Sequence, residues 1–209
     1  MKTTRATLFA ACLWLAACGG GEPDAGDAAA VGDDTAAAPM SGMDTMGATG
    51  PDPMPAGAAS GAAATAPMRD ASGRDLGAVS LAETGNGIRV SGTLRGLPPG
   101  TLAIHVHTTG RCEPPFESAG GHWNPTNTQH GTENPRGPHL GDMPNVEVGA
   151  DSTATVNVST PAGATLRGAN GLLDGDGAAV VVHAGADDYR TDPSGASGDR
   201  IACGVVSGT

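Results

Sequence analysis

The segment from Glu113 to Asn145 limits what this chain can fold into more than any other. It runs for over thirty residues, rich in Gly, Pro and Asn, without a helical or strand-like apolar period. An irregular loop of this length is uncommon in a compact domain unless something fixes it. It contains three histidines and an aspartate in the spacing His122-x7-His130-x8-His139-x2-Asp142. Three imidazoles and a carboxylate form a closed tetrahedral set that suits structural zinc, so we expect a metal ion to order the loop.

The other three histidines belong to short apolar segments that alternate like strands. In Ile104-His105-Val106-His107, a strand sends the two apolar side chains to one face and both imidazoles to the other. His183 ends the run Val180-Val181-Val182, on the face opposite Val180 and Val182. We therefore expect these three imidazoles on the outer face of a sheet, where an imidazole-rich site suits copper.

Counting the donors links the two groups of histidines. Two four-coordinate sites need eight donors, and the six histidines with Asp142 supply seven. Either the strand site keeps an open position, or one ligand serves both ions. A deprotonated imidazole can serve two ions because its nitrogens point in opposite directions. His122, the first histidine of the loop, is the candidate bridge. Scattered polar histidines are the alternative, which does not account for the placement of all six.

The rest of the folded part predicts an all-β domain. Glycine and proline supply 34 and 16 residues, and no long segment shows a 3.6-residue apolar period, which favours short strands and many turns. A Gly85-Asn86-Gly87 turn between two alternating segments is typical of a hairpin. A second irregular segment runs from Gly185 to Asp199. Eight strands are expected, in an antiparallel sandwich or barrel: about Ala62–Met68, Leu76–Glu83, Gly87–Arg95, Leu102–Thr108, Val146–Val148, Thr153–Ser159, Ala178–Ala184 and Ile201–Val206.

The N-terminus has the pattern of an export signal. Lys2 and Arg5 precede an apolar run that is too short to span a bilayer. The run ends Leu15-Ala16-Ala17-Cys18, which resembles a bacterial lipobox, so residues 1–17 would be removed and Cys18 would be lipidated. An ordinary signal peptide with a chance cysteine is the alternative. Either way, we expect an exported protein of the periplasm or cell envelope, and the lipobox predicts a lipoprotein anchored in the membrane bilayer.

Residues 18–60 are predicted to form a disordered tether, and residues 61–209 the folded domain. The tether consists mostly of Ala, Gly, Pro and Asp, without a lysine, an arginine or an aromatic residue. It cannot bury enough apolar surface to offset its ordering entropy. Met40, Met43 and Met46 are soft side chains that suit Cu(I), but a disordered tail that tolerates methionine is the favoured interpretation.

Export also constrains the cysteines and the partners. With Cys12 in the signal and Cys18 lipidated, Cys112 and Cys203 remain, and two thiols in an oxidising compartment are most simply a disulfide.

Seven of the 22 acidic residues lie in the tether, which leaves 15 in the folded part against 9 arginines and no lysine. Nothing in this acidic domain predicts nucleic acid as a partner.

Several sequence blocks resemble the copper/zinc superoxide dismutases, particularly the exported bacterial members. The blocks extend, in order, over nearly the whole folded part. They are His105-Val106-His107, Ser118-Ala119-Gly120-Gly121-His122-Trp123-Asn124-Pro125, Gln129-His130-Gly131, Pro138-His139-Leu140-Gly141-Asp142, Val181-Val182-His183-Ala184-Gly185-Ala186-Asp187-Asp188 and Gly198-Asp199-Arg200-Ile201-Ala202-Cys203-Gly204-Val205. The resemblance implies an eight-stranded antiparallel Greek-key barrel or sandwich, with the two long loops forming the metal site.

The resemblance also assigns roles to single residues. It implies copper on His105, His107, His122 and His183, zinc on His122, His130, His139 and Asp142, and an internal disulfide between Cys112 and Cys203. Asp187 matches a carboxylate that links a copper histidine to a zinc histidine and so orients both; a plain loop acid is the alternative. Arg200 matches an arginine beside the open copper position, where a fixed cation would hold an anionic substrate. A surface arginine is the alternative there.

The implied activity is the dismutation of superoxide to dioxygen and hydrogen peroxide by Cu(II)/Cu(I) cycling, with structural zinc. His122 and Arg200 would be the catalytic residues, the first taking up a proton and the second holding superoxide. An exported protein that buffers or delivers copper and zinc without turnover is the competing function, although storing a cation gains nothing from a guanidinium beside the site. A monomer and a homodimer both stay open, because exported members assemble in different ways.

One departure from the family bears on the rate. Family members often place lysines around the channel to attract superoxide, and the mature chain has none. Arg111, Arg136 and Arg190 are the nearby substitutes, so the electrostatic attraction of the substrate is the property that the resemblance leaves open.

Overall fold

The computed structural model describes residues 63–168 and 171–209. The predicted signal peptide (residues 1–17), Cys18 and the rest of the tether up to residue 60 lie outside these residues. Within the described ranges, no helix is long and apolar enough to cross a membrane.

The all-β prediction is confirmed, with ten strands in the described residues in place of the eight expected. All the strand pairs are antiparallel. The strands are β1 (Ala63–Asp70), β2 (Asp75–Thr84), β3 (Gly87–Arg95), β4 (Gly100–Leu102), β5 (Ile104–His107), β6 (Val146–Val148), β7 (Thr153–Ser159), β8 (Ala179–His183), β9 (Arg200–Val205) and β10 (Ser207–Gly208). One 3-10 turn in the described part of the chain, η1, covers Glu117–Ala119.

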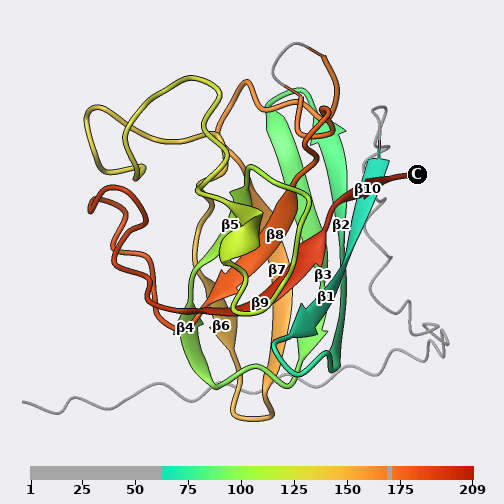
Figure 1. Cartoon of the computed structure of the whole chain (residues 1–209). Coiled ribbons are helices and arrows are strands. Elements are labelled where there is room, and N and C mark those ends of the chain that lie inside the picture. Colours follow the sequence, from blue (N-terminus) through green and yellow to red (C-terminus); the bar gives the residue numbers. More distant parts are fainter. Residues whose placement is uncertain (1–62, 169–170) are drawn as a thin grey trace, which may run out of the picture. The chain divides into compact units, whose positions relative to one another are not determined.

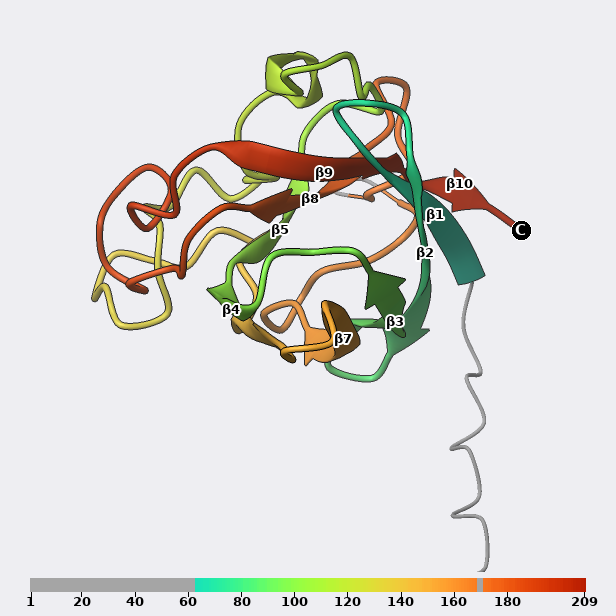
Figure 2. The same ribbon diagram turned by 90° about the horizontal axis from the view of Figure 1, so that it is seen from below.

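The sheet curls into a nearly closed barrel. Its strand order is β4-β6-β7-β3-β2-β1-β9-β8-β5, with β10 paired to β1. The two strands at the ends of this order, β4 and β5, follow each other in the chain with only Ala103 between them, so the ends of the sheet meet there (Figures 1 and 2). Between β3 and β4 the chain passes over β7 and β6, the crossover of a Greek key.

The two additional strands have local causes. The strand expected over Leu102–Thr108 is split because the chain changes partners at Ala103: β4 pairs with β6, and β5 pairs with β8. Ala103 itself donates to the Gly185 carbonyl at 2.8 Å and accepts from the His183 N–H at 2.9 Å. The strand β10 is a two-residue pairing of the C-terminal end with β1.

Alternating side chains fill the barrel. β2 and β3 pair over eight positions around the predicted turn at Gly85-Asn86, and Leu81 and Val90 are fully buried. On β8, Val180 and Val182 belong to the core inside the barrel. Val181 belongs to a second buried cluster, which also contains Phe116 and Cys203 from the disulfide region. Both faces of β8 are therefore covered, which explains a strand of continuous apolar residues.

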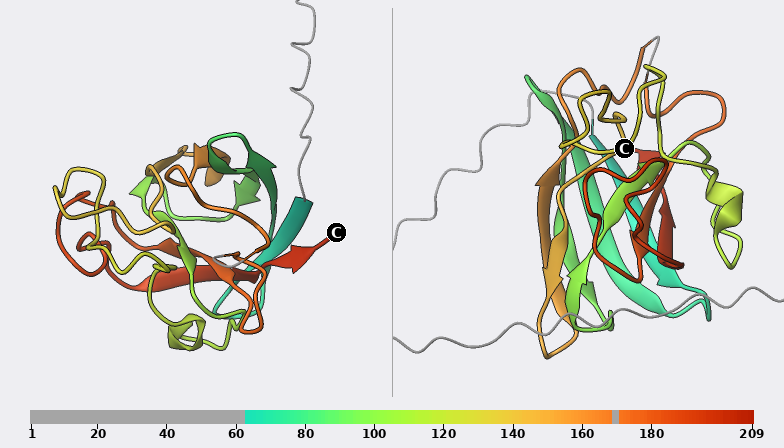
Figure 3. Two further views of the ribbon diagram at one scale, coloured as in Figure 1. Left: turned by 90° about the horizontal axis from the view of Figure 1, so that it is seen from above. Right: turned by 90° about the vertical axis from the view of Figure 1, so that its left-hand side faces the viewer.

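Two long loops lie side by side on the outside of the barrel, next to β5 (Figures 2 and 3). They are the predicted irregular segments, residues 113–145 and 185–199. The first loop is tied to β9 by the predicted disulfide between Cys112 and Cys203, which the structure confirms. The apolar side chains of Phe116, Leu140 and Met143 are buried, so this loop is anchored by packing as well as by a covalent bond.

Removing the disulfide should lower the free energy of unfolding. The bond joins residues 91 positions apart, for which the chain-entropy estimate is a stabilisation of about 4 to 5 kcal/mol. Urea unfolding of the metal-stripped Cys112→Ala/Cys203→Ala variant, followed by circular dichroism, measures the loss against the unmodified chain. A difference below about 1 kcal/mol would contradict the anchoring role.

Candidate metal centre

Backbone pairing places the first loop against the free edge of β5. The Trp123 N–H donates to the Val106 carbonyl at 2.8 Å, and the Val106 N–H donates to the Gly141 carbonyl at 2.9 Å. Gly141 in turn donates to the Trp123 carbonyl at 2.8 Å. A Cβ atom on Gly141 would lie 2.3 Å from the Val106 oxygen, so only glycine allows this approach. The pairing brings His122 opposite His107 and carries the neighbouring side chains of the loop over the outer face of β5.

Asp142 gathers the three loop histidines. Its Oδ1 atom lies 2.9 Å from His122 Nδ1, 3.0 Å from His130 Nδ1 and 3.3 Å from His139 Nδ1. Its Oδ2 atom accepts the N–H groups of Gly131 and His139, both at 2.9 Å. All four side chains of this zinc-side set (His122, His130, His139 and Asp142) are buried, and their ligand atoms lie within 4.8 Å of one another. This is the set predicted from the loop spacing.

A second set of four imidazoles, which we call the copper-side set, adjoins the first. It consists of His105, His107, His122 and His183, again buried and with ligand atoms within 4.8 Å of one another. His107 and His183 hold backbone carbonyls through Nδ1, those of Gly120 at 2.9 Å and Gly198 at 3.2 Å. Their Nε2 atoms lie 3.4 Å apart. The Nδ1 atoms of both rings are thus engaged by carbonyls, and their Nε2 atoms are directed at the other members of the set.

His122 belongs to both sets. Its Nδ1 faces Asp142, and its Nε2 is buried without a hydrogen-bond partner in the described residues. The Nδ1 atoms of His105 and His139 are buried and unpartnered in the same way, the latter lying near Asp142 without hydrogen-bond alignment. Leaving a buried polar atom unpaired is costly. Such atoms converging among other imidazoles fit metal coordination, so the residues present suit both a copper and a zinc ion.

Asp187 joins the two sets from behind. Its carboxylate lies 2.8 Å from His105 Nε2 through one oxygen and 2.9 Å from His130 Nε2 through the other. Asn145, which the sequence did not single out, holds this residue: its side chain accepts from the Asp187 N–H at 2.9 Å and donates to the Asp187 carbonyl at 3.0 Å. The end of the first loop therefore fixes the backbone of Asp187 in the second loop.

Arg200 lies beside the copper-side set, at the start of β9. Its guanidinium donates to the carbonyls of Phe116 at 2.6 Å and Gly120 at 2.8 Å. The Gly120 carbonyl also bonds His107 Nδ1, so one peptide group positions both the cation and a histidine of the set. Arg200 lines a channel of about 410 Å³ together with His107, His122 and His183. A small anion entering this channel would meet the guanidinium and the copper-side set together.

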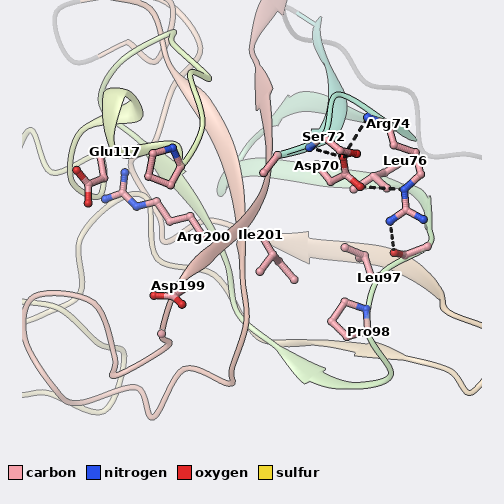
Figure 4. Close-up of a pocket in the computed structure, with 14 residues that line it drawn as sticks. Asp70, Ser72, Arg74, Leu76, Leu97, Pro98, Glu117, Asp199, Arg200 and Ile201 are labelled. Carbon is pink, nitrogen blue, oxygen red and sulfur yellow. Dashed lines mark hydrogen bonds and ion pairs between the residues drawn. The ribbon is translucent and has the colours of Figure 1, made fainter.

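Arg200 also lines a larger cavity, of about 800 Å³. Its apolar wall includes Leu97 and Ile201, and Arg200 extends toward Glu117 at its edge (Figure 4). No histidine lines it among the described residues. Burial lowers the pKa of Arg200, and the charge of Glu117 acts in the opposite direction. Arg200 therefore lines both the channel and a cavity that contains none of the donors.

Burial keeps most of the copper-side imidazoles neutral. It lowers the pKa of His107 well below the ordinary value, lowers that of His183 to about 3, and lowers that of His122 to about 4 against the hydrogen bond with Asp142. His130 differs: burial lowers its pKa, but the contacts with Asp142 and Asp187 outweigh burial and raise it to about 9. Neutral imidazole is the ligand form, so a metal ion on the zinc side has to displace one proton.

Known proteins resemble this chain in both sequence and fold. The family model described as copper/zinc superoxide dismutase (SODC) matches residues 76–206. A superoxide dismutase [Cu-Zn] of Aquifex aeolicus is 43% identical over 146 residues, covering 68% of this chain and 85% of its own length. The superoxide dismutase [Cu-Zn] of Caulobacter vibrioides is 43% identical over 148 residues, covering 68% and 84%. The crystal structure of a SOD-like protein from Bacillus subtilis superposes with a TM-score of 0.64 at 39% identity, covering 68% of this chain and 96% of that one.

In protein stripped of metal, the free energy of unfolding should fall between about pH 6.5 and pH 9. The pKa of His130 is about 9 in the folded chain and about 6.5 in an unfolded chain. Its proton therefore stabilises the folded state fully below about pH 6.5, and the effect is lost as pH rises through about 9. Urea unfolding at a series of pH values measures the slope. The His130→Gln variant is the control, and an equal slope in both proteins would contradict the assignment.

Proposed function

Because the chain belongs to the copper/zinc superoxide dismutase family, we propose that it is an enzyme that converts two superoxide ions and two protons to dioxygen and hydrogen peroxide. The observation that carries the proposal is the pair of buried donor sets that share His122, with Arg200 lining the channel to one of them. The family supplies the metals, copper and zinc. The structure supplies the reason to assign each metal to its own set.

Donor chemistry divides the two metals. His105, His107, His122 and His183 offer imidazole nitrogens only, which suit copper, and the channel keeps this set accessible. His122, His130, His139 and Asp142 form a buried set with a carboxylate, which suits structural zinc. Copper, when bound, supplies the one-electron exchange between Cu(II) and Cu(I) that oxidises one superoxide and reduces the next.

Arg200 is assigned to binding and orienting superoxide. Bonds to two backbone carbonyls fix its guanidinium before a substrate arrives. These bonds use two of the five N–H donors of the group, and the others can hold an anion in the channel. A side chain that is already fixed loses little conformational freedom when the anion binds. The electrostatic attraction between Arg200 and superoxide therefore contributes to binding affinity and to the orientation of the substrate.

His122 is assigned to proton transfer as well as to bridging. Its two nitrogens face the two donor sets, Nδ1 toward Asp142 and Nε2 toward the copper-side set. An Nε2 that is not held by a metal could carry a proton beside the channel that His122 lines and pass it to reduced superoxide. The Asp142 side keeps the ring in place through this exchange, and a zinc ion there would tune its basicity.

Export and anchoring complete the proposal. The lipobox-like run Leu15-Ala16-Ala17-Cys18 and the basic residues before it support export to the cell envelope, with a lipid on Cys18. The tether between Cys18 and the domain is predicted to be a flexible chain of about forty residues, whose root-mean-square reach would be roughly 35–40 Å. The enzyme would then act close to a membrane surface without being part of it.

The full chain loaded with copper and zinc should accelerate the loss of superoxide beyond an equal amount of free copper. Replacing Arg200 with Ala should lower the second-order rate constant about ten- to a hundredfold at unchanged metal content, because the channel loses its fixed cation. Stopped-flow decay of superoxide measures the rate, and Arg89→Ala, an exposed arginine on β3, is the control. Full metal loading without activity would instead support a copper and zinc buffering protein.

The Cys18→Ser variant should move from the membrane fraction to the soluble fraction of the cell envelope. It removes the sulfur that would carry the lipid but leaves the folded domain unchanged, so activity per copper should not fall. Fractionation with an activity assay on each fraction measures both. Retention of the variant in the membrane fraction would contradict lipid anchoring through Cys18.

A further inference from the structure

Four of the six histidines of the two donor sets are held from behind, through the ring nitrogen that does not face a metal position. His105 and His130 are held by Asp187, and His107 and His183 by backbone carbonyls. His122 uses both nitrogens toward the two sets. His139 alone departs from the pattern among these described residues: its Nδ1 faces Asp142, and no hydrogen bond engages its Nε2.

Asp192 is placed to complete the pattern. Its Oδ1 atom lies 3.9 Å from His139 Nε2. The same oxygen accepts the backbone N–H of His130 at 2.7 Å, so this carboxylate is already fixed against the zinc-side loop. The His139 side chain is 7% exposed, whereas that of Asp192 is 45% exposed and has room to shift. Closing the gap to a hydrogen bond requires a movement of only about 1 Å.

We propose that Asp192 is a positioning residue of the zinc site, which takes the Nε2–H of His139 and so keeps Nδ1 of that ring directed at zinc. A carboxylate behind a metal-bound imidazole fixes the tautomer and raises the basicity of the ligand. The inference rests on the proposed function, because it requires zinc on the His122, His130, His139 and Asp142 set.

The proposal gives the second loop a larger role in zinc retention. Asp187 and Asp192 both belong to residues 185–199, and each contacts a zinc-side histidine of the first loop. Asp187 supports His130, and Asp192 supports His139 while bonding the His130 backbone. The first loop would then supply the zinc ligands, and two carboxylates of the second loop would orient the His130 and His139 rings.

The test measures zinc release from the full chain loaded with zinc alone, using excess of a zinc-binding dye. Asp192→Ala should release zinc about tenfold faster than the unmodified chain. Asp192→Asn should show a smaller increase, because its amide oxygen still accepts both N–H groups without the charge. Asp199→Asn removes the same charge from the same loop at a side chain that faces the larger cavity (Figure 4), and should release zinc at the unmodified rate.

A second measurement separates positioning from a general structural role. In the zinc-loaded, ¹⁵N-labelled chain, the His139 Nε2–H should exchange slowly with water, and in Asp192→Ala it should exchange fast. Circular dichroism of both variants checks the fold. The proposal would be overturned if both Asp192 variants released zinc at the rate of the unmodified chain. It would also be overturned if the His139 Nε2–H of Asp192→Ala exchanged as slowly as that of the unmodified chain. If the unmodified chain itself takes up no zinc, the proposed function fails first, and the two failures are thereby distinguished.

Discussion

The buried carboxylate of Asp142 is the group on which the irregular half of the molecule depends. One oxygen faces three ring nitrogens, and the other accepts two backbone N–H groups of the same loop. A buried carboxylate retains its charge only when partners of this kind surround it, and its pKa lies below the ordinary value because hydrogen bonds with the histidines outweigh the effect of burial. The polar centre thus acts together with the buried apolar side chains and the disulfide that anchor this long loop.

The barrel contributes the frame against which this centre is assembled. β5 offers two imidazoles on its outer face and a free edge that pairs with the first loop. The disulfide fixes the start of that loop to β9, and Arg200 at the beginning of β9 bonds two carbonyls of the same region. Since the Gly120 carbonyl also holds His107, the distance between the cation and the copper-side set is fixed by backbone, and it does not depend on a mobile side-chain contact.

The strands and the metal-binding side chains are predictable from the sequence for different reasons. Alternation marks a strand wherever one face is buried, and few residue types can hold a metal, so the histidines and Asp142 were identifiable from type and spacing. The split at Ala103 was missed, because alternation runs through a residue at which the chain exchanges one partner strand for another. Asn145 and Asp192 were missed because amides and acids are common in loops, and only the folded chain shows which of them face Asp187 and His139.

The charge around the channel follows from the same packing. Burial keeps His107, His122 and His183 neutral, so Arg200 is the one permanently charged side chain among the described residues that line the channel. Among the arginines named above as substitutes for channel lysines, Arg190 is paired with Glu133 across the two loops, which cancels its charge at a distance. In physiological salt a charge acts over about 8 Å. A small anion in the channel would therefore meet one permanent positive charge, that of the Arg200 guanidinium.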